Sequence, residues 1–338
     1  MQRFTIRRTW AIGAGALAVM LLASGCLPAS PAAQPPSGSG AAAEAPASPP
    51  PAGASSRDLA SWPFSSTSPW NTPLGSAAAY DARQIVNLAS TTPWINSSSY
   101  SVPVVRASAG DALVTINVSG GTFPGPVTLR IPASARPAAG TDAHLAVISP
   151  DGLHANEFWA LDLGARTAGV TIPVDLKGSG VGIGWVRATG VSLLGGLIRS
   201  NETTNIPHAL AISLPYHLLG NGHVWPAISN DDGGAPGTAP EGSLLAIPAG
   251  TPRPAGLSPL GNAIFDALSR YGAYVVDSTG ASDATVLYTE PTMAPSAVDA
   301  AIGDVAKILP SVRRVTNNGP SAIGGPGTRL AASAPAAS

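Results

Sequence analysis

The chain has 338 residues, of which 38 are glycine, 34 are proline and only 11% are charged. This composition disfavours helical bundles and coiled coils and favours short strands joined by turns. The formal net charge is −1, Lys177 and Lys307 are the only lysines, and there is no basic run, all of which argues against nucleic acid as a partner.

The first 26 residues have the pattern of an export signal. Three arginines precede an apolar stretch over residues 10–23, and "LLASGC" ends at Cys26, the only cysteine. The stretch is shorter than the roughly 20 residues that a transmembrane helix requires. The segment resembles a bacterial lipoprotein signal, which implies that Cys26 carries a lipid and that the protein is anchored at the cell surface or in the periplasm. Ala23 stands where that signal usually has leucine, so cleavage by an ordinary signal peptidase is the alternative.

Composition divides the rest of the chain into three parts. Residues 27–56 are almost entirely Ala, Pro, Ser and Gly, which predicts a disordered tether between the membrane and a domain. Residues 319–338 have the same character and predict a disordered tail. A single globular domain is expected over residues 57–318, which is long enough to bury a large core. With Cys26 used as an anchor, this domain has no disulfide and no thiol nucleophile.

Short β-rich runs follow one another through the domain. They lie at 101–108, 112–120, 125–133, 144–150, 156–164 and 169–176. Alternating polarity and bounding turn residues predict an antiparallel β-sandwich of jelly-roll type. Asp151-Gly152 predicts a tight hairpin. Helices are expected at 258–272, with Ser258 as its cap, and at 294–309, and strands at 273–278 and 284–290. The expected fold class is therefore mainly β with one or two peripheral helices.

Three stretches resemble a little-characterised group of secreted bacterial proteins. They are "WPFSSTSPWNTPLG" (62–75), "IPHALAISLP" (206–215) and "LGNAIFDALSRYGAYVVDS" (260–278). The resemblance covers most of residues 62–290 and implies one globular domain in an exported protein. It implies no particular reaction.

Ionisable side chains are scarce, so their clustering within "TDAHLAVISPDGLHANEFWALDLG" (141–164) carries information. We expect an enzyme that degrades an extracellular or cell-wall polysaccharide, with His144, Glu157 and His208 as catalytic candidates. Candidates for substrate binding are Arg130, Asp142, Asn156 and Trp225. Flat indole rings are natural platforms for sugars, and those considered are Trp62, Trp70, Trp94, Trp159, Trp185 and Trp225.

Two reactions fit these residues. A polysaccharide lyase needs a base and a group that neutralises the uronate carboxylate. Its base would be His144 or His208, its neutralising groups Arg130 and Asn156, and its acid Tyr216 or Tyr271. A glycoside hydrolase needs two carboxyl groups roughly 5–10 Å apart. These would be Glu157 together with Asp142, Asp232 or Glu241.

No cofactor is required by the sequence, and a divalent metal ion is an alternative. His144, Glu157 and His208 offer two histidines and one carboxylate, while Asp231 and Asp232 suit calcium. Neither H-x-H nor H-E-x-x-H is present, and G-x-S-x-G is absent too. The rival function is a non-catalytic surface lipoprotein that binds glycan or protein through a tryptophan-lined face. It would be favoured if strand alternation placed His144 and Glu157 on opposite faces.

Overall fold

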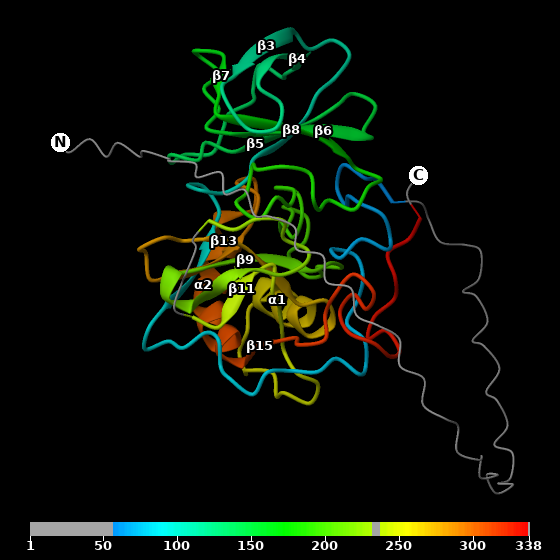
Figure 1. Ribbon diagram of the computed structural model, residues 1–338, viewed down its shortest axis with the longest axis vertical. Helices are drawn as coiled ribbons and strands as arrows, with labels where there is room; N and C mark the ends of the chain where they lie inside the picture. Colours follow the sequence, from blue (N-terminus) through cyan, green and yellow to red (C-terminus); the bar gives the residue numbers. More distant parts are fainter. Residues whose placement is uncertain (1–56, 232–236, 337–338) are drawn as a thin grey trace, which may run out of the picture. The chain divides into compact units, whose positions relative to one another are not determined.

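The computed structural model describes residues 57–231 and 237–336 (Figure 1). The expected signal with Cys26 and the tether at 27–56 lie outside the described residues. Within the described ranges, strands dominate. The helices are α1 (Pro259–Arg270), α2 (Pro295–Ile308) and two single 3-10 turns (Tyr216–Leu218 and Leu309–Ser311). The prediction of a mainly β fold with one or two helices is confirmed. None of the helices in this part of the chain has the length and apolar character needed to cross a membrane.

The largest sheet has six strands. In spatial order these are β1 (Thr92–Asn96), β14 (Ala284–Tyr288), β9 (Leu210–Leu214), β13 (Ala273–Ser278), β12 (Leu244–Ala246) and β15 (Arg313–Arg314). The β1–β14 and β9–β13 pairs are parallel, and the other pairs are antiparallel. Parallel neighbours require a long crossover, and the chain from β9 to β13 supplies one that contains α1. The pairing is therefore mixed, which differs from the purely antiparallel sandwich that alternation suggested.

Helix α1 forms where the sequence predicts it. The Ser258 side chain accepts a hydrogen bond from the Gly261 N–H at 3.0 Å, which caps the first turn. Ile264 and Leu268 lie on the apolar face and are fully buried in a core shared with α2 and the six-stranded sheet. Each such side chain contributes about 1.5–3 kcal/mol of burial free energy. Gly272, with φ 82°, ends the helix and leads directly into β13.

Three smaller sheets complete the fold (Figure 1). The first has four strands in the order β2 (Val104–Arg106), β5 (Leu145–Ile148), β6 (His154–Trp159) and β8 (Val170–Asp175). The second has three strands in the order β4 (Gly125–Arg130), β3 (Leu113–Val118) and β7 (Thr167–Ala168). The third pairs β10 (Leu219–His223) with β11 (Ala239–Glu241). The predicted hairpin joins β5 to β6. Gly152 has φ 71°, and the Asp151 carboxylate accepts the Leu153 N–H at 2.8 Å.

The C-terminal segment up to Ala336 belongs to the folded region. The Arg57 N–H donates to the Ala336 carbonyl at 3.2 Å, and the Leu330 N–H donates to the Leu74 carbonyl at 2.9 Å. Residues 319–336 therefore differ from the disordered tail that their composition predicts. Their backbone groups are paired with a segment from the other end of the domain, and composition contains no sign of that pairing.

Candidate functional site

The structure divides the three catalytic candidates between two polar clusters, each built around a buried arginine. His144 and Glu157 both interact electrostatically with Arg187. His208 interacts instead with Arg199 and Glu202. The three candidates therefore do not converge on one site.

His144 precedes β5 and is buried. Its Nε2 lies 3.1 Å from the Val186 carbonyl oxygen, to which the neutral ring donates. Burial, together with the nearby Arg187 guanidinium, lowers the pKa of His144 to about 3. A histidine that stays neutral and turned inward lacks the solvent access that a general base for a polysaccharide needs.

Glu157 is fully buried in β6 and anchors the segment 186–194. Its carboxylate accepts the N–H groups of Leu193 at 2.8 Å and Leu194 at 3.2 Å, and also the hydroxyl of Ser192. Burial raises the pKa of Glu157, whereas these donors favour its charged form. Glu157 and His144 both contact this segment, so they lie on one side of the sheet. Their contacts indicate that they hold Arg187 in place.

His208 belongs to a second cluster, the Arg199 network, which consists of Arg199, Glu202, His208 and Glu290. His208 Nε2 lies 3.1 Å from Glu202 Oε2, and Arg199 Nε donates to Glu290 Oε1 at 2.8 Å. All four residues are buried. A cavity of about 10 Å³ beside Arg199 and His208 has room for roughly one water molecule, so it cannot admit a sugar.

Three of the four substrate-binding candidates make contacts of other kinds. Arg130, in β4, donates to the backbone carbonyl of Asp111 at 2.6 Å. Asn156 is half-buried in β6, next to Glu157 and pointing to the opposite face of the strand. Trp225 is half-buried and packs edge-on against Tyr274, with ring centroids 6.4 Å apart. Only the fourth candidate, Asp142, lies near Arg187.

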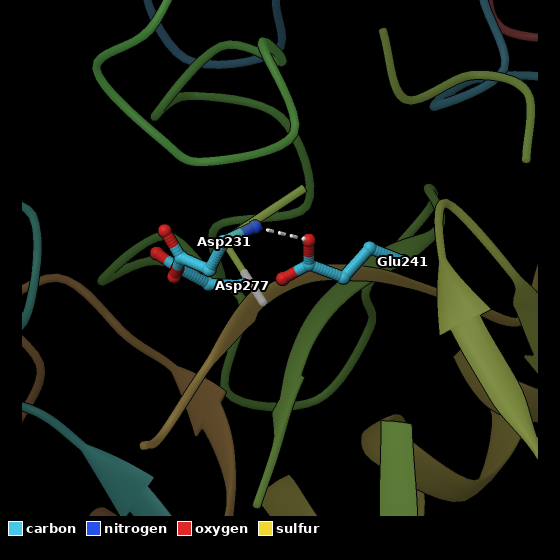
Figure 2. A group of neighbouring side chains, drawn as sticks. All are labelled: Asp231, Glu241 and Asp277. Atoms are coloured by element: carbon cyan, nitrogen blue, oxygen red, sulfur yellow. Dashed lines mark hydrogen bonds between the residues drawn. The ribbon is translucent and has the colours of Figure 1, made fainter. Parts of the chain in front are cut away.

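Three carboxyl groups that face one another form the strongest chemical feature of the described residues. They belong to Asp231, Glu241 and Asp277, and each offers an oxygen within 4.8 Å of the others (Figure 2). The Asp231 N–H donates to Glu241 Oε2 at 3.0 Å. We call Arg187 together with Asp142, Asp231, Glu241 and Asp277 the Arg187 centre.

Asp277 is a carboxyl group whose surroundings favour its protonated form. Burial raises the pKa of Asp277 well above its usual value, and the charge of Asp231 and the hydrogen bond that protonated Asp277 donates to it act in the same direction. Arg187 acts in the opposite direction. A β-bulge between Val275 and Asp277 interrupts the register of β13 with β9 at this point. Bulges of this kind re-aim side chains and occur often beside active sites.

Asp142 lies close to Asp231 and Arg187, in a segment with left-handed backbone angles. Burial raises the pKa of Asp142, as does the charge of Asp231, while the indole N–H of Trp159 acts as a hydrogen-bond donor and lowers it. Ala143 and Ala160, the residues after Asp142 and Trp159, both have left-handed φ angles of 39° and 51°. Strain at residues other than glycine is typical of functional sites.

No protein-family model, curated protein or solved structure matches the chain. Its function is therefore inferred from the chemistry of this site.

Exposed tryptophans lie beside the acidic groups. Trp159 is 39% exposed, and Trp185 is 50% exposed and donates through its indole nitrogen to Ser229 Oγ at 2.9 Å. Ser229 is only two residues from Asp231 in the chain. Trp70, by contrast, is fully buried against Tyr274. Trp159 and Trp185 are thus two exposed tryptophans close to carboxyl groups of the Arg187 centre.

The centre also contains the only metal-ligand grouping in the described ranges. Asp231, Glu241 and Asp277 offer carboxylate oxygens, which Ca²⁺ and Mg²⁺ prefer. A cation there would compete with the proton that the raised pKa of Asp277 favours. The expected set of His144, Glu157 and His208 is not assembled, and Asp232 lies outside the described residues.

Sequence reasoning missed Asp277 entirely. It considered Asp231 with calcium and Glu241 as a hydrolase carboxylate, but Asp277 was passed over as the end of an apolar strand. One signal was present, because the carboxyl end of a buried parallel strand is a common position for a functional side chain. That signal becomes visible only when β13 is known to pair in parallel with β9.

Proposed function

We propose that the protein is an exported, lipid-anchored glycoside hydrolase that acts on an extracellular or cell-wall polysaccharide. The observation that carries this proposal is the group of three carboxyl groups, Asp231, Glu241 and Asp277, whose oxygens lie within 4.8 Å of one another, with a raised pKa for Asp277 and for the nearby Asp142. Hydrolysis of a glycosidic bond needs one carboxyl group that is protonated and one that is ionised. Environments that separate the pKa values of neighbouring carboxyl groups supply both forms at one pH.

Each group has a defined role in the proposal. Asp277, whose pKa is raised, supplies the proton to the leaving sugar. Before the reaction, Asp277 donates a hydrogen bond to Asp231. Asp142 is the second carboxylate, which acts on the sugar or on a water molecule. Trp159 and Trp185 bind sugar rings through their exposed faces.

Hydrolase chemistry has more support than lyase chemistry. A lyase would use His144 or His208 as base, yet both are buried and engaged with protein groups. It would also use Arg130 to neutralise a uronate, and that guanidinium donates to the backbone carbonyl of Asp111, just before β3. The carboxyl groups required for hydrolysis are instead partly exposed next to exposed indoles.

A product assay tests the proposal. The full chain would be incubated with neutral and uronic-acid polysaccharides while new reducing ends and the ultraviolet absorbance of unsaturated uronate are followed. We expect reducing ends without that absorbance, and their loss in Asp142→Asn. Asp299→Asn, an exposed acidic residue on α2, is the matched control and should retain full activity.

Other products would contradict the proposal in specific ways. Reducing ends together with unsaturated uronate would indicate a lyase. Glycan retention without any cleavage would indicate the rival, a glycan-binding lipoprotein that uses the same tryptophans. Retention abolished by Trp185→Ala but kept in Trp94→Ala would then locate the binding face, since Trp94 is equally exposed (45%) on the distant edge strand β1.

A further inference from the structure

The ring of Trp159, the last residue of β6, packs against Gly169, a position where a larger residue would not fit. A Cβ at Gly169 would lie 2.5 Å from two atoms of the Trp159 ring, which is far inside normal contact. The Gly169 N–H also donates to the Trp159 carbonyl at 3.0 Å. Gly169 is not among the glycines with left-handed φ. Glycine is therefore needed at this position for the space it leaves to the indole.

The seated indole is tied to Asp142 through both the backbone and the side chain. The Ala160 N–H donates to the Asp142 carbonyl at 2.6 Å, and the Leu161 N–H donates to the Ala143 carbonyl at 3.3 Å. The indole N–H of Trp159 faces the Asp142 carboxylate as a donor. Three hydrogen bonds thus join Asp142 and its neighbour Ala143 to Trp159 and the two residues after it.

We propose that Trp159, seated on Gly169, is the positioning residue for Asp142 and sets the carboxylate against a sugar bound on the exposed indole. The role of Asp142 in this inference rests on the proposed hydrolase function. One side chain then binds the substrate and orients the reacting group, so the two are aligned without a separate loop movement. The hydrogen bond also favours the ionised carboxylate, in a setting where Asp231 opposes ionisation and Arg187 assists it.

Two variants separate positioning from stacking. Trp159→Phe keeps an aromatic face and removes the N–H donor. Gly169→Ala keeps Trp159 and Asp142 intact but displaces the ring. Matched controls are Trp94→Phe, an exposed tryptophan on β1, and Gly303→Ala on α2, where an added Cβ meets nothing within 4 Å. Thermal unfolding of each variant verifies that it is folded.

The primary readout is the titration of the Asp142 carboxyl group by carbon NMR in the full chain, which requires no substrate. Loss or displacement of the donor should raise the pKa of Asp142 in both variants and in neither control. With substrate, the acidic limb of the pH profile should move to higher pH. In Trp159→Phe, kcat should fall about tenfold or more while KM changes by less than about threefold, because misplacement of a reacting group costs rate rather than binding.

The outcomes distinguish this inference from the function on which it rests. An unchanged Asp142 titration in Trp159→Phe overturns the inference, whatever the activity. If Trp159→Phe does not fold, an unchanged titration in Gly169→Ala overturns it equally. Shifted titrations in both variants support it. A wild-type protein that shows these shifts but cleaves no glycan would overturn the proposed hydrolase and leave Trp159 as the group that positions Asp142.

Discussion

The Arg187 centre and the Arg199 network both contain a buried arginine and several carboxyl groups, but they differ in charge balance and in exposure to solvent. In the Arg199 network, Arg199 and His208 face the carboxylates of Glu290 and Glu202, and all four side chains are buried. In the Arg187 centre, one guanidinium interacts with the carboxyl groups of Asp142 and Asp277, and Asp231 and Glu241 add two more carboxyl groups beside Asp277. Asp142, Asp231 and Asp277 are at least partly exposed.

The difference between them is one of charge balance and access. Balanced charges that are sealed from water hold parts of a fold together, because each ion has its partner. An excess of carboxyl groups forces one of them to keep a proton, which creates an acid beside its conjugate base. The presence of histidine and carboxylate therefore says little about function until their partners are known.

The largest effect should come from Asp277→Asn, which removes the proton donor of the Arg187 centre. General acid catalysis contributes about 10²–10⁴-fold, so kcat/KM should fall by that factor.

The free energy of unfolding of Asp277→Asn at neutral pH should instead rise above that of the wild type. The folded-state pKa of Asp277 is raised, so its contribution to stability is present below the unfolded pKa and is lost as pH rises through the folded pKa. Reducing-end assays and thermal unfolding at neutral pH measure both. An inactive variant that is also less stable than wild type would contradict this assignment.

The next largest effect should come from Arg199→Met, which leaves the buried Glu290 carboxylate without its cation. Removing one partner of a buried pair costs about 3–5 kcal/mol of unfolding free energy. Urea unfolding measures it, and the double change of Arg199 and Glu290 to Met should recover part of the loss. A cost below about 1 kcal/mol would show that the network does not stabilise the fold.

The two buried histidines should show opposite pH dependence. The pKa of His144 is about 3 in the folded protein, against 6.5 for a free histidine. The difference in stability between wild type and His144→Gln should therefore shrink as pH falls below 6.5, by up to about 1.4 kcal/mol per pH unit.

For His208, burial lowers the pKa, but the charge of Glu202 and its hydrogen bond outweigh burial and raise it. The stability difference between wild type and His208→Gln should be fully present below pH 6.5 and shrink as pH rises above it. Urea unfolding across pH 4–8 compares the two. Parallel curves for both variants would contradict the assignment of the histidines to different electrostatic environments.

The smallest effect is expected at the surface. Arg253 donates to Asp266 at 2.8 Å, and both side chains are more than a third exposed. Arg253→Gln should cost less than about 1 kcal/mol, and high salt should reduce even that cost. A larger, salt-insensitive cost would point to the packing of Arg253 over the Phe265 ring, 4.5 Å from its centroid.

Local features of the fold could be predicted because their causes lie within a few residues. The Ser258 cap and the apolar face of α1 are set by neighbours along one helix. The Asp151-Gly152 hairpin follows from a single turn. Strand pairing could not be predicted in the same way, because alternation shows which face is buried and leaves the neighbouring strand undetermined.

The candidate site shows the same contrast between local features and contacts from distant parts of the chain. The sequence places Asp142 in a short stretch rich in ionisable residues, and in the structure Asp142 lies near Arg187 and Asp231. Glu157 was assigned to catalysis, but its three donors come from residues 192–194, far from it in the chain.

The sequence by itself determined a mainly β domain with two helices, a hairpin that brings Asp142 toward Trp159, and a short supply of ionisable groups. Only the tertiary structure decided which of those groups meet. Asp231, in a loop, and Asp277, at the end of a buried strand, come together because the Asp231 N–H donates to Glu241 and the adjoining Gly242 N–H donates to the Val275 carbonyl in β13. Whether a carboxyl group is paired, crowded or buried depends on contacts between distant segments, and those contacts set its pKa and its chemistry.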